Sequence, residues 1–154
     1  MEGVIIMIKL YDNNSLVIKN ISCNLTFDLK LRGHLVQVDG ASGTGKTLLF
    51  NTINDIRNFY LNNKMEDINV FAYDINSITI DKLKSIKNSL IVVDRCNLLS
   101  PDLVSYINSD KNNTYIVLGR GNLGFNLSPN YFATLVTCNN TVSLNYDFSE
   151  VGWF

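Results

Sequence analysis

The sequence contains few of the residues that mark secreted, metal-binding or highly charged proteins. Its three cysteines, Cys23, Cys96 and Cys138, stand far apart and show none of the close spacings of metal sites. Their odd number, without a secretory leader, favours reduced thiols in the cytoplasm. Lysine and arginine total 13 and aspartate and glutamate 14, giving a formal net charge of −1. The chain as a whole therefore has no electrostatic attraction to nucleic acid or to an anionic membrane.

Long hydrophobic runs are also missing. The apolar run Val4–Ile8 is too short for the core of a signal peptide or for a membrane span. The single histidine, His34, precedes a predicted strand, and we interpret it as a turn residue rather than a catalyst. Hydrophobic residues nevertheless make up 46% of the 154 residues, which is enough for a core. We predict one domain over residues 1–154.

One segment, from Gly40 to Thr47, fits the pattern G-x-x-x-x-G-K-[ST] of a phosphate-binding loop. The residues before it, Leu35 to Asp39, form a short apolar run that predicts a buried strand. The residues after it have apolar side chains at helical spacing, which predicts a helix from about Lys46 to about Asn62. Strand, glycine loop and helix form the context that the motif requires.

Each position of this loop has a chemical role in phosphate binding. The glycines permit positive φ angles and close approach of the backbone, whose N–H groups form an anion nest at the start of the helix. Lys46 brings a cation to the β- and γ-phosphates, and the hydroxyl of Thr47 is placed to bind Mg²⁺. The predicted nucleotide-binding residues are Gly40, Ala41, Ser42, Gly43, Thr44, Gly45, Lys46, Thr47 and Leu48.

Asp94 is the second candidate of the nucleotide site. It follows the apolar run Leu90–Val93, which predicts a buried parallel strand. A carboxylate at the end of such a strand holds Mg²⁺ beside Thr47, so Thr47 and Asp94 are the predicted metal residues. The alternative is an acidic residue that merely leaves the core.

The strand and helix pattern predicts the fold class. Strands alternate with helices over residues 35–138, which predicts a three-layer α/β fold with a mostly parallel central sheet. Residues 1–31 predict an N-terminal antiparallel section, with a hairpin of Val4–Leu10 against Ser15–Ile21. The alternating segment Thr141–Phe148 predicts an edge strand.

These motifs resemble those of the P-loop NTPase superfamily, and the resemblance covers about Leu35 to Thr137. The implied strand order resembles the AAA-like, additional-strand division. The front end also resembles ABC-type ATPases, in which an aromatic residue, here near Tyr11, stacks on adenine. The chain has no LSGGQ-type signature and no room for the helical subdomain of that family. The resemblance thus implies a minimal AAA-like or ABC-like nucleotide-binding core.

Two arginines bear on catalysis within this resemblance. Arg95 stands where many additional-strand ATPases carry a glutamate that polarises the attacking water, and arginine cannot accept a proton. Arg120 follows the predicted strand Tyr115–Leu118, where related ATPases carry a sensor residue for the γ-phosphate. Lys46 and Arg120 are the predicted catalytic residues, and the alternative for Arg120 is a turn residue in solvent.

The sequence therefore predicts a protein that binds ATP or another nucleoside triphosphate together with Mg²⁺, and that hydrolyses it slowly or only with a partner. A small nucleoside or nucleotide kinase is the first alternative, against which no arginine-rich lid is found. A structural subunit that keeps the fold for interaction is the second. The expected partners are the nucleotide and either another protein or a second copy of the chain. A membrane span and nucleic acid are not expected.

Overall fold

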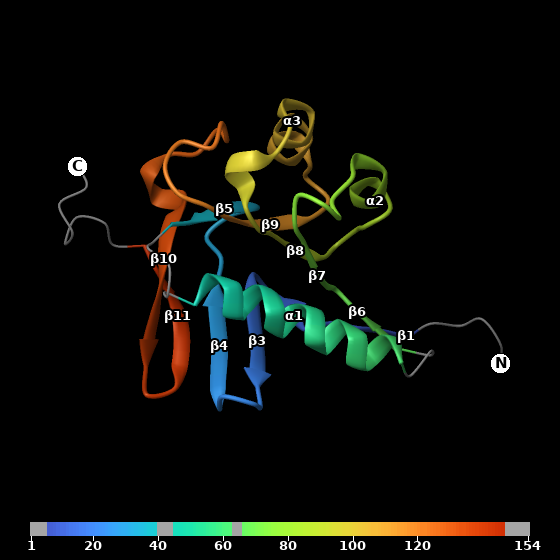
Figure 1. Cartoon of the computed structure of the whole chain (residues 1–154), viewed down its shortest axis with the longest axis vertical. Coiled ribbons are helices and arrows are strands. Elements are labelled where there is room, and N and C mark those ends of the chain that lie inside the picture. Colours follow the sequence, from blue (N-terminus) through green and yellow to red (C-terminus); the bar gives the residue numbers. More distant parts are fainter. Residues whose placement is uncertain (1–5, 40–44, 63–65, 147–154) are drawn as a thin grey trace.

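A nine-stranded mixed sheet forms the centre of the fold in the computed structural model, which describes residues 6–39, 45–62 and 66–146 (Figure 1). Its strand order is β2-β3-β4-β11-β10-β5-β9-β8-β7. The strands are β2 (Tyr11–Asp12), β3 (Ser15–Asn20), β4 (Leu25–Lys30), β5 (Leu35–Val38), β7 (Val70–Tyr73), β8 (Leu90–Val93), β9 (Thr114–Leu118), β10 (Phe132–Cys138) and β11 (Thr141–Asn145). Two further strands, β1 (Ile6–Ile8) and β6 (Glu66–Ile68), pair in parallel as a separate two-stranded sheet.

The directions of the strands change along the large sheet. Strands β10, β5, β9, β8 and β7 each run parallel to their neighbours in that order. The pairs β2–β3, β3–β4 and β10–β11 are antiparallel, and β11 is parallel to β4. Strands β3, β4, β10 and β11 run steeply across the direction of β5 and β9, so the sheet curves until it is nearly barrel-shaped (Figure 1).

Three α-helices accompany the sheet within the described residues: α1 (Lys46–Leu61), α2 (Ile80–Lys84) and α3 (Pro101–Ser109). Short 3₁₀ turns cover Cys96–Leu98 and Pro129–Tyr131. Helix α1 packs through Leu49 and Ile53 into the core formed with β3 and β4, whereas α2 and α3 lie together on the other side of the parallel strands (Figure 1).

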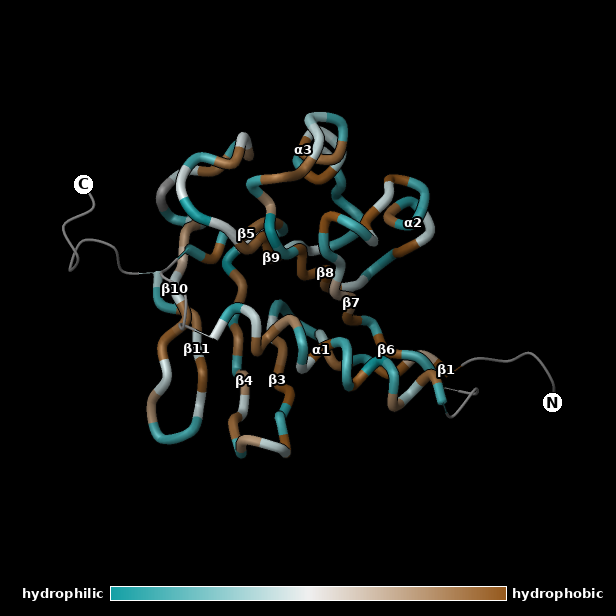
Figure 2. The backbone as a smooth tube through the Cα atoms, in the orientation of Figure 1, coloured by the Kyte–Doolittle hydropathy of each residue, from teal (hydrophilic) through white to brown (hydrophobic). Residues whose placement is uncertain are grey.

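Both faces of strand β8 are buried, which explains its continuous apolar sequence. Leu90 and Val92 belong to the core that contains helix α1, and Ile91 and Val93 to the core that contains α2 and α3. The turn between β10 and β11 is polar by contrast and is teal in the hydropathy view (Figure 2). Asp94 directly follows β8, so it lies where the chain leaves a strand that is buried on both faces.

The predicted fold class is wrong. The sheet is mixed and nearly barrel-shaped, more described residues lie in strands than in helices, and the fold is not a three-layer α/β arrangement around a mostly parallel sheet. The N-terminal strands β2, β3 and β4 pair antiparallel, as expected, but they belong to the same sheet as the parallel strands, because β4 pairs with β11 and β11 with β10. One hydrogen-bonded sheet thus joins the beginning of the chain to its centre.

Two local predictions fail because each assumed the wrong neighbouring strand. The segment expected to be an edge strand, Thr141–Phe148, supplies β11, which has partners on both sides. The residues Val4–Leu10 do not form a hairpin with Ser15–Ile21, because β1 pairs with β6 and only the short β2 faces β3. An alternating pattern reports which face of a strand is buried, and it carries no information on the neighbouring strand.

Candidate functional site

Several of the predicted site residues line one cavity of about 270 Å³ at the carboxyl ends of β8 and β9. The cavity is bounded by the first residue of α1 and by the segments that follow the two strands. Its lining residues are Lys46, Asp94, Arg95, Asn97, Leu118, Gly119 and Arg120. Lys46, Asp94 and Arg120 are far apart in sequence, and the parallel pairing of β8 with β9 and of β9 with β5 brings them together.

Helix α1 places Lys46 at this cavity. Gly45 precedes the helix with φ 100° and ψ 3°, a left-handed conformation that favours glycine. The helix is 16 residues long and has no acidic residue in its own first turn, so its N-terminal end keeps the partial positive charge of the helix dipole within the helix itself. Thr47 is exposed beside Lys46 but does not line the cavity, and Leu48 packs against the core.

The remaining predicted loop residues are not placed. Gly40, Ala41, Ser42, Gly43 and Thr44 lie outside the residues that the structure describes. Their predicted contribution to phosphate binding stays a prediction.

Asp94 and Arg95 form a compact corner at the end of β8. The carboxylate Oδ1 of Asp94 accepts a hydrogen bond of 2.8 Å from the backbone N–H of Arg95. Arg95 adopts φ 53° and ψ 46°, which is uncommon for a residue other than glycine, asparagine or aspartate. Its guanidinium donates to Oδ2 of Asp74 at 3.0 Å, across the neighbouring strand end of β7.

The surroundings of Asp74 favour its ionised form. Burial acts to raise its pKa, but hydrogen bonds from the backbone of Asn76, the guanidinium of Arg95 and the hydroxyl of Ser77 together lower the pKa below the ordinary value. Arg95 therefore forms an ion pair with Asp74, and it also lines the cavity.

The segment that carries Arg120 is fixed to the end of β5. The backbone N–H of Gly121 donates to Oδ2 of Asp39 at 3.2 Å, and that of Gly119 donates to the carbonyl of Val38 at 3.2 Å. From inside β5, the buried side-chain amide of Gln37 donates to the carbonyl of Gly121 at 2.8 Å. Arg120 itself is exposed. Hydrogen bonds thus fix Gly119 and Gly121 on either side of Arg120, and the Arg120 side chain lies exposed at the cavity.

Sequence reasoning missed Gln37 and Asn97. Gln37 carried a usable signal, because a polar residue inside a buried apolar strand needs a hydrogen-bond partner. Asn97 lies in the 3₁₀ turn after β8 and carried no comparable signal.

A protein-only metal site is not found: no group of three histidine, cysteine, aspartate or glutamate side chains within the described residues is arranged to hold a metal. Mg²⁺ in nucleotide sites is usually bound by one or two protein groups together with phosphate oxygens and water. Asp94, in the cavity wall, is suited to that use. The structure gives no direct contact of Thr47 with the cavity.

Tyr11 and His34 lie at the opposite ends of the parallel strands. The hydroxyl of Tyr11 donates to Oγ1 of Thr114, the first residue of β9, at 2.9 Å. His34 directly precedes β5, as expected of a turn residue. The adenine-stacking role that the ABC-type resemblance implies for Tyr11 is therefore wrong, because Lys46 and Asp94 lie at the other ends of these strands.

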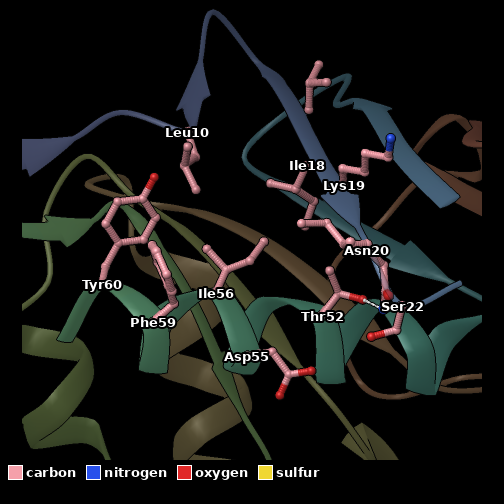
Figure 3. Close-up of a pocket in the computed structure, with 12 residues that line it drawn as sticks. Leu10, Ile18, Lys19, Asn20, Ser22, Thr52, Asp55, Ile56, Phe59 and Tyr60 are labelled. Carbon is pink, nitrogen blue, oxygen red and sulfur yellow. Dashed lines mark hydrogen bonds between the residues drawn. The ribbon is translucent and has the colours of Figure 1, made fainter. Parts of the chain in front are cut away.

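Another cavity contains none of the predicted site residues. It is a groove of about 470 Å³ between β3 and α1, with an apolar lining to which Ile18, Ile56 and Phe59 contribute (Figure 3). Asn20 on β3 donates to Oγ1 of Thr52 on α1 at 2.8 Å at one end of the groove. This wall chemistry differs from that of the cavity at Lys46, where five of the seven lining residues are charged or polar.

No protein-family model, no curated protein and no solved structure matches the chain. Together with the mixed, nearly barrel-shaped sheet, this result overturns the predicted identification as a P-loop NTPase of the AAA-like or ABC-like division. The labels AAA-like ATPase and hydrolase, which depended on that identification, are wrong for the same reason. ATP binding receives no support from a relative. None of the helices among the described residues has the length and apolar content needed to cross a bilayer.

Proposed function

We propose that the chain binds a nucleoside triphosphate together with Mg²⁺ in the cavity at Lys46, Asp94 and Arg120. The observation that carries this proposal is the convergence of two cations and a carboxylate from three elements at the N-terminal end of a 16-residue helix. Helix N-termini attract phosphate groups through their N–H groups and dipole. The proposal rests on this local chemistry and does not require membership of a family.

Each residue has a distinct role in the proposed complex. Lys46 neutralises the terminal phosphates, and Arg120 contacts the γ-phosphate from the opposite wall. Asp94 would hold Mg²⁺ beside the phosphates, where the ion would neutralise part of their charge. Thr47 does not line the cavity, so it is not assigned a contact with the ion. A volume of about 270 Å³ suits the phosphate tail of a nucleotide, and the base then lies outside the cavity.

Hydrolysis by the isolated chain is proposed to be weak or to depend on a partner. A general base must reach the attacking water within hydrogen-bond distance. Of the carboxylates at these strand ends, Asp74 is paired with Arg95, and Asp39 accepts the N–H of Gly121. A protein partner or a second copy of the chain supplies the missing group in this proposal. A cytoplasmic location stays a prediction based on the cysteines.

Calorimetric titration with MgATP tests the proposed function, with Lys46→Ala as the informative variant. The substitution removes a charge-assisted contact of about 1.5–3 kcal/mol, so affinity should fall by roughly tenfold to a hundredfold. Alanine preserves the helix because its helix propensity is high. The control is Lys84→Ala, an exposed lysine on α2, which should leave affinity unchanged. Equal MgATP affinity of the parent and Lys46→Ala would contradict the proposal, as would the absence of binding by the parent.

A further inference from the structure

A second polar cavity, of about 460 Å³, lies at the amino ends of the parallel strands, whereas Lys46 lies near their carboxyl ends. Its walls come from the turn between β2 and β3 and from the segments that precede β5, β8 and β9. Residues that line it include Lys9, Asn13, His34, Asn88, Lys111 and Asn112. Unlike the groove between β3 and α1, its lining is mainly amide and charged groups.

Two buried asparagines build the floor of this cavity. The side chain of Asn69 accepts the N–H of Tyr11 at 3.0 Å and donates to its carbonyl at 2.7 Å. The side chain of Asn113 accepts the N–H of Ser89 at 3.2 Å and donates to the carbonyl of Ile86 at 2.7 Å. Both side chains are about 4% exposed. Their amides are fully used in fixing the loops, so the floor is rigid before any ligand arrives.

The rim has hydrogen-bonding capacity that the protein does not use. The side chains of Lys9, Asn13, Asn88 and Asn112 are exposed and make no hydrogen bond or ion pair with other described residues. Nζ of Lys111 lies 3.5 Å from Nε2 of His34, so an ammonium and an imidazole face each other. A fixed polar floor beneath unused donors is the arrangement of a ligand site.

The charged residues that line the cavity favour an anionic ligand. Lys9 and Lys111 contribute two positive charges and Asp12 one negative charge, which makes the lining basic in a chain whose net charge is −1. An oxyanion between Lys111, His34 and Lys9 would accept hydrogen bonds from the ammonium groups and from the asparagine amides. Carboxylates other than Asp12 do not line the cavity.

We propose that this cavity binds a phosphate group, either as free phosphate or as the head of a small phosphorylated molecule. The Lys111 and Lys9 ammonium groups and the His34 imidazole hold the phosphate, and the side-chain amides of Asn88 and Asn112 donate to it or to neighbouring hydroxyls. The cavity has room for more than a phosphate ion, and the amides offer both donors and acceptors for hydroxyl groups.

His34 is the only histidine of the chain, so one imidazole resonance in a proton NMR spectrum reports on the site. Burial and the ammonium of Lys111 lower its pKa, while the backbone of Asn108 and the carboxylate of Asp110 act in the opposite direction. A bound dianion favours the protonated imidazole, so the apparent pKa of His34 should rise by about 1 on saturation. Lys9 and Asp12 are the other charged groups that line the cavity.

The experiment titrates the parent protein with inorganic phosphate, ribose 5-phosphate and ribose at constant ionic strength, with chloride as the reference anion. Inorganic phosphate and ribose 5-phosphate should shift the His34 resonance saturably and raise its pKa, and ribose should not. Tighter binding of ribose 5-phosphate identifies a phosphate ester as the ligand, and equal affinities identify the free anion. No saturable shift with either phosphate compound, or an equal shift with ribose, would overturn the proposal.

Variants separate this cavity from the proposed nucleotide site. Lys111→Ala should reduce the phosphate-induced change of the His34 resonance at least tenfold, and Lys9→Ala should reduce it less. Lys84→Ala is the matched control and should respond like the parent. Lys46→Ala should also respond like the parent, because Lys46 lies at the other ends of the strands. A phosphate response that is lost in Lys46→Ala and kept in Lys111→Ala would place the anion at Lys46 and refute the second site.

Discussion

Arg95 shows how a single residue affects both the stability and the chemistry of the cavity at Lys46. Its backbone is left-handed, and its guanidinium is paired with Asp74 at 3.0 Å. The pair joins the ends of β7 and β8 beside the cavity. A cation that is engaged in this way holds the strand ends in place and offers no group that could accept a proton from water.

The Arg95–Asp74 pair predicts a pH-dependent contribution to stability. Because the folded pKa of Asp74 is lowered, its contribution is present above the unfolded pKa of about 3.9 and is lost as the pH falls through the folded pKa. Arg95→Ala should therefore reduce the free energy of unfolding at pH 7 by about 0.2–1 kcal/mol, since the pair is partly exposed. Urea unfolding at pH 7 and pH 3 measures the difference, with Arg95→Lys as the charge-preserving control. A destabilisation of Arg95→Ala that is the same at both pH values would contradict this role.

Individual site residues were predictable where they follow buried strands. Lys46, Asp94 and Arg120 stand at the carboxyl ends of parallel strands or just after them, and such ends meet at one edge of a sheet. The pairing of Arg95 with Asp74 was not predictable, because it requires the knowledge that β7 lies beside β8. The position of Gln37 in a buried strand indicated a hydrogen-bond partner, but the identity of that partner in the loop after β9 required the same kind of knowledge.

At the scale of elements, the beginning of α1 depends on Gly45. A Cβ atom at this position would have room, since the nearest atom outside its chain neighbours, Cδ1 of Leu135, lies at 3.9 Å. The cost of Gly45→Ala is therefore the backbone strain of φ 100°, on the order of 1–2 kcal/mol. Thermal or urea unfolding should show this loss, and Asn51→Ala on the exposed side of the same helix should be neutral or stabilising. A neutral Gly45→Ala would mean that the helix begins in another conformation.

Elements with strong local signals were predicted well. The helix expected from about Lys46 to about Asn62 runs from Lys46 to Leu61, and the apolar run before Asp94 is β8. Pro101 lies in the first turn of α3, and the side chain of Ser100 accepts the N–H of Leu103 as its cap. These features follow from residues within a few positions of one another, so sequence patterns determine them.

At the scale of the whole molecule, β11 holds the sheet together. It is parallel to β4 on one side and antiparallel to β10 on the other, so it joins the N-terminal strands to the strands that carry the cavity at Lys46. Val142, in the middle of this joint, is 2% exposed, while its neighbour Ser143 faces solvent. The integrity of the mixed sheet therefore depends on the inner face of a late strand.

Val142→Asp should destabilise the protein by more than about 3 kcal/mol, because it buries a charge without a partner in the middle of the sheet. Ser143→Asp adds the same side chain to the exposed face of the same strand and should change stability by less than about 0.5 kcal/mol. Urea unfolding followed by circular dichroism compares the two variants with the parent. Similar stabilities of the two variants would contradict the position of β11 inside the sheet.

The overall architecture was the part that the sequence predicted least. The alternation of Thr141–Asn145 is the same for an edge strand as for an inner strand with one exposed face, and only the long-range partners β4 and β10 distinguish the two. The expected family followed from the loop and from Asp94, which are local features. A mixed, nearly barrel-shaped sheet arises from pairings between residues more than one hundred positions apart, such as Phe27 with Val142.

The Mg²⁺ dependence of ATP binding tests most directly whether the cavity at Lys46 is a nucleotide site. Calorimetric titrations of the parent, Asp94→Asn and the control Asp102→Asn with ATP, each with and without Mg²⁺, supply the measurement. The parent and the control should bind MgATP more tightly than metal-free ATP, and Asp94→Asn should lose most of this difference while its affinity for metal-free ATP changes little. If Asp94→Asn keeps the full Mg²⁺ effect of the parent, or if ATP does not bind to the parent at all, the proposed site is wrong.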